Sequence, residues 1–456
     1  MTSAKFVAAV AAGALLLRLV GLGFGPYHPD EHLVINHSLA FGTGDLNPHM
    51  FYFPSFFMYL LFGVYGIFYL LGLAVGKFHR PDDLLALYLA SPQVFYVLGR
   101  VVSACFGAAT TVLAYRLGKT YKNSRTGTAA ALFLAVNFLH ARDSHFATVD
   151  VALTFFMTLS LWFLTGYLNK RKPETYRWAA FAAGMAAAVK YNGFILAAPI
   201  AAAYLLTGFP ADWKAGKGNA VRALFLDGAR SALWMFLGFF LFSPYVILDY
   251  RSSLEFIRKL YELNRAFDVS WGAHARSLYF ALGEPLFVLS VLGLLMSFRT
   301  SLPVRQAGVA GLEMTRSIVV AIYFMSYYVM ITRAGQPFER YVLPLVPVCI
   351  VWAAAFLDEM EIRWAGRFTR GRFFGILCGI LALAALPKTL FSDYLFLRKD
   401  TRDLGREWIE RHVDAGSVVV IDDPGQSPKL AVAPQIVTRQ KNHHRQGQWD
   451  QRKVPP

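Results

Sequence analysis

The sequence has little charge for its length. Only 16% of its 456 residues are Asp, Glu, Lys or Arg, whereas 56% are hydrophobic; soluble globular proteins carry roughly 25% charged residues. Nearly uncharged runs such as 229–248 and 340–357 are long enough to cross the ~30 Å hydrocarbon core of a bilayer as helices. Many such runs follow one another, which excludes a soluble globular chain and predicts an all-α, polytopic membrane protein.

Cysteine is scarce, and the basic charge is not concentrated. Cys105, Cys349 and Cys378 lie in apolar runs, without the spacing of a zinc site or a disulfide framework. The first 24 residues are apolar and no small-residue cleavage pattern follows them, so we expect a retained first span. The net charge of +16 is dispersed among the connections between spans. This argues against nucleic-acid binding and for contacts with membrane lipids.

The hydropathy pattern predicts about eleven transmembrane helices. The expected ranges are 5–24, 95–116, 127–141, 149–168, 177–189, 191–208, 229–248, 277–298, 316–333, 340–358 and 371–391. The connections on one side hold 20 Lys and Arg residues, and those on the opposite side hold 12. Because positive charge stays in the cytoplasm, the opposite side is predicted to be the outer face.

The segment 51–76 decides this orientation. It is apolar enough to span, which would give twelve spans, but every later basic connection would then lie outside. We therefore expect 51–76 to pack along the outer face, within a first outer loop over 25–94 that forms interfacial helices. A hydrophobic cavity for a lipid tail should open beside it. The alternative of a true span stays open.

Two adjacent carboxylates, Asp30 and Glu31, follow the first span in the run PYHPDEH. Burying an ionisable residue beside hydrocarbon is costly, so such residues are candidate functional groups. The plain alternative is a solvated loop in which Asp30 caps a helix begun by Glu31. His28 and His32 are weak candidate ligands for a divalent cation, although no fixed ligand spacing supports one. No other cofactor is indicated.

A second outer stretch, 140–156, contains Arg142, Asp143 and Asp150. The two aspartates are seven residues apart, which would place them on one helical face if the helix begins early. Arg142 and Asp143 could merely end a span at the interface. Asp150 precedes an apolar run at the membrane boundary, so we take Arg142 and Asp150 as candidate substrate-binding residues.

Single cations stand at the outer ends of three spans: Arg100, Lys190 and Arg340. Each of these side chains could simply extend to the lipid headgroups. Together with the carboxylates, however, they describe a site for an anionic group with a base beside it, and Arg and Lys suit phosphate.

A sugar carried on a polyprenyl phosphate fits such a site, because its tail is apolar, its phosphate interfacial and its sugar hydrated. Transfer of the sugar to a hydroxyl needs a general base, and cations stabilise the departing phosphate. A carboxylate also favours the oxocarbenium-like centre, and a single displacement inverts it. A lipid or anion transporter is the alternative, although we find no internal repeat and the charges lie at one face. A scaffold subunit is a weaker alternative.

The order of these segments resembles the GT-C superfamily of membrane glycosyltransferases. Its nearest branch contains protein O-mannosyltransferases and the lipid A aminoarabinose transferase, and is glycosyltransferase family 39-like. The matching steps, over about 390 residues, are the Asp-Glu pair, GRVVSACFG around Arg100, TVDVALTFF around Asp150, GMAAAVKYNGF around Lys190 and RYVLPLVP from Arg340. Each motif is weak alone, so the resemblance depends on their order.

The resemblance implies that Asp30 is the catalytic base, that Glu31 supports it, and that Arg100, Lys190 and Arg340 bind the donor phosphate. It implies a catalytic domain over residues 1–391 and a hydroxyl acceptor on lipid A, a protein or a polysaccharide.

This sequence lacks the β-trefoil domain of eukaryotic protein O-mannosyltransferases, since its longest loop between spans is 249–276. That favours a bacterial inner-membrane enzyme that uses undecaprenyl phosphate at the periplasmic face. Residues 392–456 are expected to form a short outer-face α/β tail, disordered after about residue 424.

Overall fold

The computed structural model describes residues 3–25, 28–209, 217–265, 271–299, 309–333, 337–364, 371–414 and 416–417. Two compact units divide the chain, Met1–Leu397 and Arg398–Pro456. The described residues form helices and no strands, which confirms the predicted all-α class. In the second unit the described helix is α20 (Thr401–His412), whereas the strand expected after it and the end of the tail lie outside the described residues.

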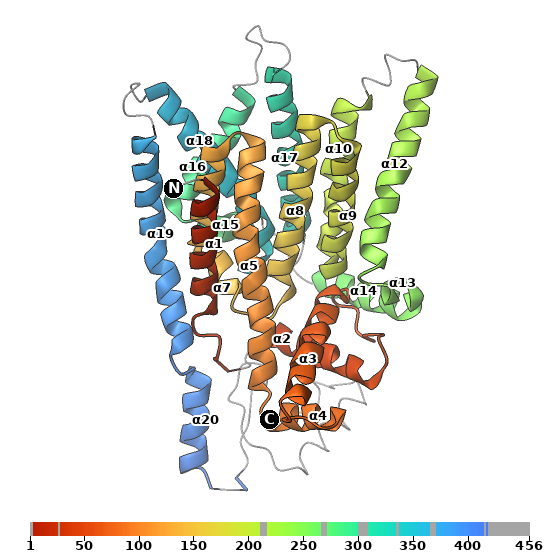
Figure 1. The fold of residues 1–456 in the computed structure, drawn as a ribbon, viewed down its shortest axis with the longest axis vertical. Coiled ribbons are helices and arrows are strands. Elements are labelled where there is room, and N and C mark those ends of the chain that lie inside the picture. The colour runs from red at the N-terminus through yellow and green to blue at the C-terminus, as the bar shows by residue number, and fades with distance from the viewer. Residues whose placement is uncertain are drawn as a thin grey trace, which may run out of the picture. The chain divides into compact units, whose positions relative to one another are not determined.

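Long helices run side by side through the first unit (Figure 1). They are α1 (Ser3–Leu19), α5 (Gln93–Tyr121), α6 (Ser124–Ala135), α8 (Val149–Lys170), α9 (Pro173–Val189), α10 (Ala197–Thr207), α12 (Lys217–Phe240), α16 (Glu284–Arg299), α17 (Val309–Thr332), α18 (Val346–Trp364) and α19 (Arg372–Leu397). Seven described helical segments are long and apolar enough to cross a membrane, or eight if one bent pair is counted as a span. The protein is therefore a polytopic membrane protein, as predicted.

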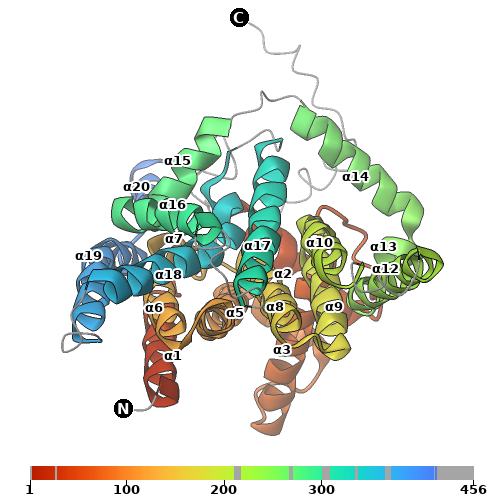
Figure 2. The same ribbon diagram turned by 90° about the horizontal axis from the view of Figure 1, so that it is seen from above.

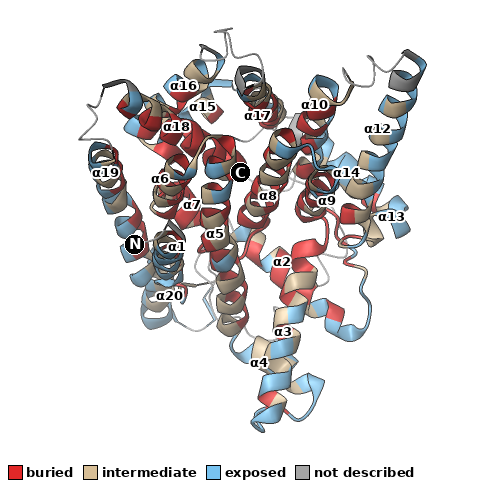
Figure 3. Ribbon diagram, turned by 45° about the horizontal axis from the view of Figure 1, so that its top comes forward, coloured by how far each residue is buried: buried red, intermediate tan, exposed pale blue. Residues whose placement is uncertain are grey.

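Short helices gather toward one end of this unit (Figure 1). They are α2 (Pro29–Ala40), η1 (Phe41–Thr43), α4 (Pro81–Ala90), α7 (Phe138–Asp143), η2 (Tyr191–Leu196), α13 (Tyr245–Leu248), α14 (Tyr250–Arg265), α15 (Trp271–Leu282) and η3 (Glu339–Leu345). We call the end with α2, α4 and α14 the outer end, and the opposite end, where α5 ends and α6 begins, the inner end. Buried residues concentrate on the central helices, whereas α12 and α14 are largely exposed (Figure 3).

Three predicted spans are broken between α-helices, and one of them, 229–248, divides into α12 and α13 at residues 241–244. Range 127–141 divides into α6 and α7 because Asn137 caps a new helix, accepting a hydrogen bond from the backbone N–H of His140 (3.1 Å). Range 277–298 divides into α15 and α16, which meet at an angle of 112°; Gly283, with φ +72°, lies at this break. Helix α7 ends at Asp143 and α8 begins at Val149, so Asp143 and Asp150 lie on different helices and the expected shared helical face is wrong.

Helix α3 (Phe56–Ala74) occupies most of segment 51–76. By length and composition it could span a membrane, yet it packs against α2 and α5, and Figure 1 shows it beside the lower part of α5, next to α4. Its interfacial placement therefore stays a prediction. A cavity of about 660 Å³ opens between α2, α3 and α4, with walls that are largely apolar, including Leu39, Phe62 and Leu84. This confirms the hydrophobic cavity expected beside 51–76.

Candidate active site

Asp30 lies in the first turn of α2, directly after Pro29 at the first helical position, where a proline costs no hydrogen bond. The residue that caps this helix is His28, whose Nδ1 accepts a hydrogen bond from the backbone N–H of Asp30 (3.2 Å). The alternative that Asp30 is the cap is therefore wrong, and its carboxylate is available for other contacts.

Three further charged side chains also stand at helix ends. Asp150 lies in the first turn of α8, where the helix dipole favours a negative charge. Lys190 occupies the extended residue between α9 and η2, and Arg340 lies in η3. Because each of these residues stands at or beside the end of a helix, its side chain can extend past that end toward the others.

The structure brings these four side chains together in a chain of ion pairs. Arg340 Nη2 donates to Asp30 Oδ2 at 3.0 Å, and Arg340 Nε lies 3.5 Å from Asp150 Oδ2. Lys190 Nζ donates to Asp150 Oδ1 at 2.7 Å. We call Asp30, Asp150, Lys190 and Arg340 the charge cluster, in which two carboxylates are matched by two cations.

The charge cluster is partly open to solvent. The side chains of Asp30 and Arg340 are 20% and 18% exposed, whereas that of Asp150 is 4% exposed. Arg340 Nε is buried and faces Asp150 Oδ2 at 3.5 Å without a hydrogen bond among the described residues, so its pairing is weaker than that of Nη2. Lys190 Nζ lies 4.8 Å from the centre of the Tyr341 ring, a cation–π contact.

Glu31 and Arg100 form a separate pair with fully buried side chains. Arg100 Nε and Nη2 donate to the two Glu31 oxygens at 2.8 and 2.7 Å. The remaining Arg100 donors bind the carbonyls of Leu22, Phe24 and Gly25. Arg100, on α5, therefore holds the segment that follows α1 in place. Its side chain is not exposed in this structure.

Arg142 lies between Glu339 and Asp143, with Nη1 2.6 Å from Glu339 Oε2 and Nη2 3.2 Å from Asp143 Oδ2. It makes no ion pair with the charge cluster among the described residues. Burial raises the pKa of Asp143 to about 6, and the charge of Arg142 opposes that rise. Glu339 was missed from the sequence; its only signal was its position directly before Arg340.

The weak metal candidates do not converge. The His28 ring packs on Phe146 at 4.7 Å, and burial lowers the pKa of His28, while His32 is exposed. Over the described ranges, no group of three or more His, Cys, Asp or Glu side chains is placed to hold a metal ion. A divalent cation therefore stays an untested prediction.

Sequence comparisons match only part of the chain. Residues 96–238 match the family model described as dolichyl-phosphate-mannose-protein mannosyltransferase. This range contains Arg100, Arg142, Asp150 and Lys190. An uncharacterized protein of Aquifex aeolicus is 31% identical over 115 residues, which is 25% of this chain and 23% of that protein. The chain thus matches less than a quarter of the length of this relative.

Structural comparisons cover most of the chain at low identity. ArnT from Cupriavidus metallidurans, solved with undecaprenyl phosphate, superposes with a TM-score of 0.58 at 17% identity, covering 90% of this chain and 73% of ArnT. An oligosaccharyltransferase of Archaeoglobus fulgidus gives 0.56 at 13% identity, covering 95% and 61%. A further structure of the archaeal enzyme, holding zinc and sulfate, gives 0.51 at 14% identity, covering 93% and 58%. At these identities the likeness establishes a shared fold.

Proposed function

We propose, from the GT-C glycosyltransferase fold of this chain, that the protein transfers a sugar from a polyprenyl-phosphate donor to a hydroxyl acceptor. The acceptor belongs to a lipid such as lipid A, a protein or a glycan, and the anomeric centre is inverted. The observation that carries the proposal is the charge cluster, which combines a part-exposed carboxylate with two cations at the outer end.

Asp30 serves as the general base in this proposal. As the acceptor oxygen attacks the anomeric carbon, its proton passes to the Asp30 carboxylate. The bond between that carbon and the phosphate oxygen breaks, and the polyprenyl phosphate leaves with the electron pair. Arg340 and Lys190 stabilise the charge that develops on the phosphate. Asp150, which contacts both cations, holds them at a spacing set by its two oxygens.

Arg340 connects the base to the phosphate site. It is bound to Asp30 through Nη2 while its Nε has no hydrogen-bond partner among the described residues. A donor phosphate that binds Nε and Lys190 Nζ would compete for Arg340 and loosen its hold on Asp30. The carboxylate would then become a stronger base with the donor in place.

In this proposal Glu31 and Arg100 do not contact the reacting groups, but hold the segments that carry them. Glu31 Oε1 also accepts from the backbone N–H of Ala147 at 2.8 Å, so one carboxylate joins α2, α5 and the turn before α8. Asp30 lies beside Glu31 in α2, and Asp150 lies in the first turn of α8, directly after the turn that Glu31 binds. We therefore propose a positioning role for Glu31 and Arg100, and extend it to Arg142 through Glu339, the neighbour of Arg340.

The donor tail has an apolar path beside the charge cluster. A groove of about 710 Å³ runs along α17, lined by Ile195, Met325, Val329 and Arg333 among others. One residue of this groove, Ile195, belongs to η2, the short helix that begins directly after Lys190. We place the prenyl tail here, with undecaprenyl phosphate as carrier and the site on the periplasmic side of a bacterial inner membrane. The cavity beside α3 is then available to a lipid acceptor.

The test compares purified protein in detergent with a panel of radiolabelled polyprenyl-phosphate sugars. Wild type should release or transfer sugar from one donor, and Asp30→Asn should lower turnover by about 10²–10⁴-fold while keeping donor binding, since only the base is lost. Asp45→Asn is the matched control, because Asp45 lies exposed in the same outer loop. Donor binding without turnover in the wild type would overturn the enzyme proposal in favour of a transporter.

A further inference from the structure

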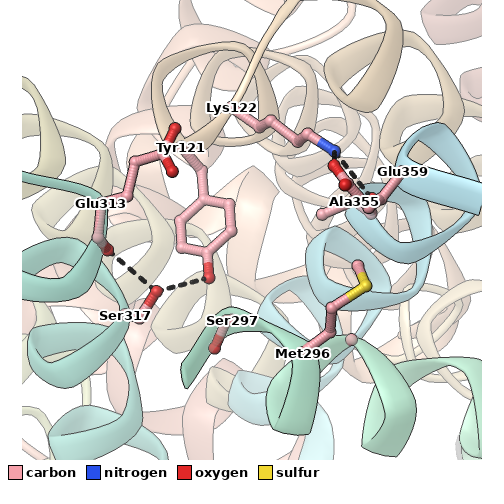
Figure 4. A pocket seen from close by; sticks show the side chains of 9 residues that line it. Tyr121, Lys122, Met296, Ser297, Glu313, Ser317, Ala355 and Glu359 are labelled. Atoms are coloured by element: carbon pink, nitrogen blue, oxygen red, sulfur yellow. Dashed lines mark hydrogen bonds and ion pairs between the residues drawn. The ribbon is translucent and has the colours of Figure 1, made fainter. Parts of the chain in front are cut away.

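A polar pocket lies at the inner end, at the opposite end of α5 from Arg100 and α2. It has a volume of about 220 Å³ and is lined from four helices by Tyr121, Lys122, Gly293, Met296, Ser297, Glu313, Ser317, Ala355 and Glu359. Lys122 Nζ lies 3.1 Å from Glu359 Oε2 on one side, and Tyr121 OH lies 3.3 Å from Ser317 Oγ on the other (Figure 4).

An apolar cavity of about 180 Å³ continues along the same helices. Its walls include Phe287 and Leu294 of α16, Phe324 of α17 and Trp352 of α18. On α16 and α18 the apolar residues lie on the turns next to those that line the polar pocket, and on α17 they begin seven residues after Ser317. The two cavities therefore follow each other between one set of helices, from the inner end toward the middle of the bundle.

The polar pocket and the apolar cavity together form a space that we call the gap. Close contact between two helix backbones shapes it. A Cβ on Gly293 would lie 2.1 Å from the carbonyl oxygen of Trp352, so α16 and α18 pack backbone to backbone and close the floor. Helix α17 contacts α16 along the other wall, and Figure 2 shows it between the α16–α18 pair and α10. A polar pocket next to an apolar cavity matches the part of a lipid where headgroup and chains meet, with the rest of the chains in the surrounding hydrocarbon.

We propose that this gap binds a membrane phospholipid with a primary-amine headgroup, such as phosphatidylethanolamine. The charged residues that line the polar pocket are two carboxylates, Glu313 and Glu359, and one cation, Lys122. The excess negative charge favours an ammonium group, and the hydroxyl and carboxylate oxygens can accept its three N–H donors.

The indole nitrogen of Trp352 bears on the same question. Trp352 is 2% exposed and lines the apolar cavity, and its Nε1 interacts with the Tyr121 side chain but makes no hydrogen bond of normal geometry among the described residues. Burying such a donor without a well-formed hydrogen bond is costly. An ester or phosphate oxygen of a lipid seated in the gap would accept this hydrogen. If the inner end faces the cytoplasm, as the basic connections predict, the lipid belongs to the cytoplasmic leaflet. The site itself does not depend on the proposed transferase activity.

Native mass spectrometry of the full-length protein tests the site after incubation with phosphatidylethanolamine, phosphatidylglycerol or phosphatidylcholine. We expect one phosphatidylethanolamine to be retained in preference to the other two. Glu313→Gln should lower its retention about tenfold, through the loss of one charge-assisted hydrogen bond. Glu255→Gln is the charge control, because Glu255 is exposed on α14.

A cavity-filling variant tests the tail. Leu294→Trp should abolish retention by filling the apolar cavity, whereas Leu295→Trp should retain the lipid, because Leu295 is 62% exposed on the same helix and outside both cavities. Equal retention of the three lipids, or equal retention by the two tryptophan variants, would overturn the proposal. Binding of phosphoethanolamine without chains would likewise overturn it, in favour of a soluble amine ligand.

Discussion

At the residue scale, the pair formed by Glu31 and Arg100 places two opposite charges out of contact with solvent. Removing one partner from a buried pair leaves the other uncompensated, which typically costs about 3–5 kcal/mol. Glu31→Gln should therefore lower the melting temperature strongly in detergent, measured by intrinsic fluorescence. The exposed pair of Arg258 and Glu262 is the control, because Glu262→Gln should change the melting temperature little. A small change in melting temperature for Glu31→Gln would contradict the role of this pair in joining α2 and the chain after α1 to α5.

Asp143 makes stability depend on pH. Burial raises its pKa from 3.8 to about 6, so the folded protein holds this proton more tightly than the unfolded chain. The free energy of unfolding should therefore fall as pH rises from about 4 to about 6. Asp143→Asn should remove this penalty and exceed wild type at pH 7 by about 2–3 kcal/mol, with the two proteins converging near pH 4. Melting temperatures across this range test it, and a difference that does not vary with pH would contradict it.

At the element scale, the positions of the polar groups of the site can be predicted from the sequence, whereas their pairing cannot. Asp30, Asp150, Lys190 and Arg340 were found because charges beside apolar runs are rare and costly. The burial of Arg100 could not be predicted from its position beside an apolar run, because it depends on hydrogen bonds to Glu31 and to three backbone carbonyls. Pairings of this kind depend on tertiary packing and have no local sequence pattern.

The broken helices were missed for a similar reason. Residues 127–141 form one apolar run, and the cap that Asn137 provides outweighs that continuity locally. The bend between α15 and α16 likewise depends on one residue, Gly283, in a left-handed conformation. Hydropathy averages over such single positions, so it located the apolar segments better than their ends.

Helix α3 gives a prediction about topology. If it lies along the outer face, single cysteines at His49 and Lys77, which flank it, should react with a membrane-impermeant maleimide from the same side. A cysteine at Lys172, between α8 and α9, should react from the opposite side. The background would lack Cys105, Cys349 and Cys378. Labelling of positions 49 and 77 from opposite sides would show that α3 spans.

At the scale of the whole molecule, the chain divides after Leu397. The charge cluster, the Glu31–Arg100 pair and the inner-end cavities all belong to the first unit. Deleting residues 398–456 should therefore leave the melting temperature and donor binding of the first unit close to those of the full chain. Circular dichroism melts and donor titrations would test this, and loss of the folded state would show that the second unit is needed for the stability of the first.

The ion pair between Asp30 and Arg340 joins residues 310 positions apart in the chain. During synthesis the base therefore emerges and inserts long before the cation that binds it, and most of the helices must be in place before the two can meet. A nascent or truncated chain that stops before η3 carries the base without its partner. If Asp30 is the base, as we propose, the site is complete only after η3 has been synthesised, and a prematurely terminated chain should lack transferase activity.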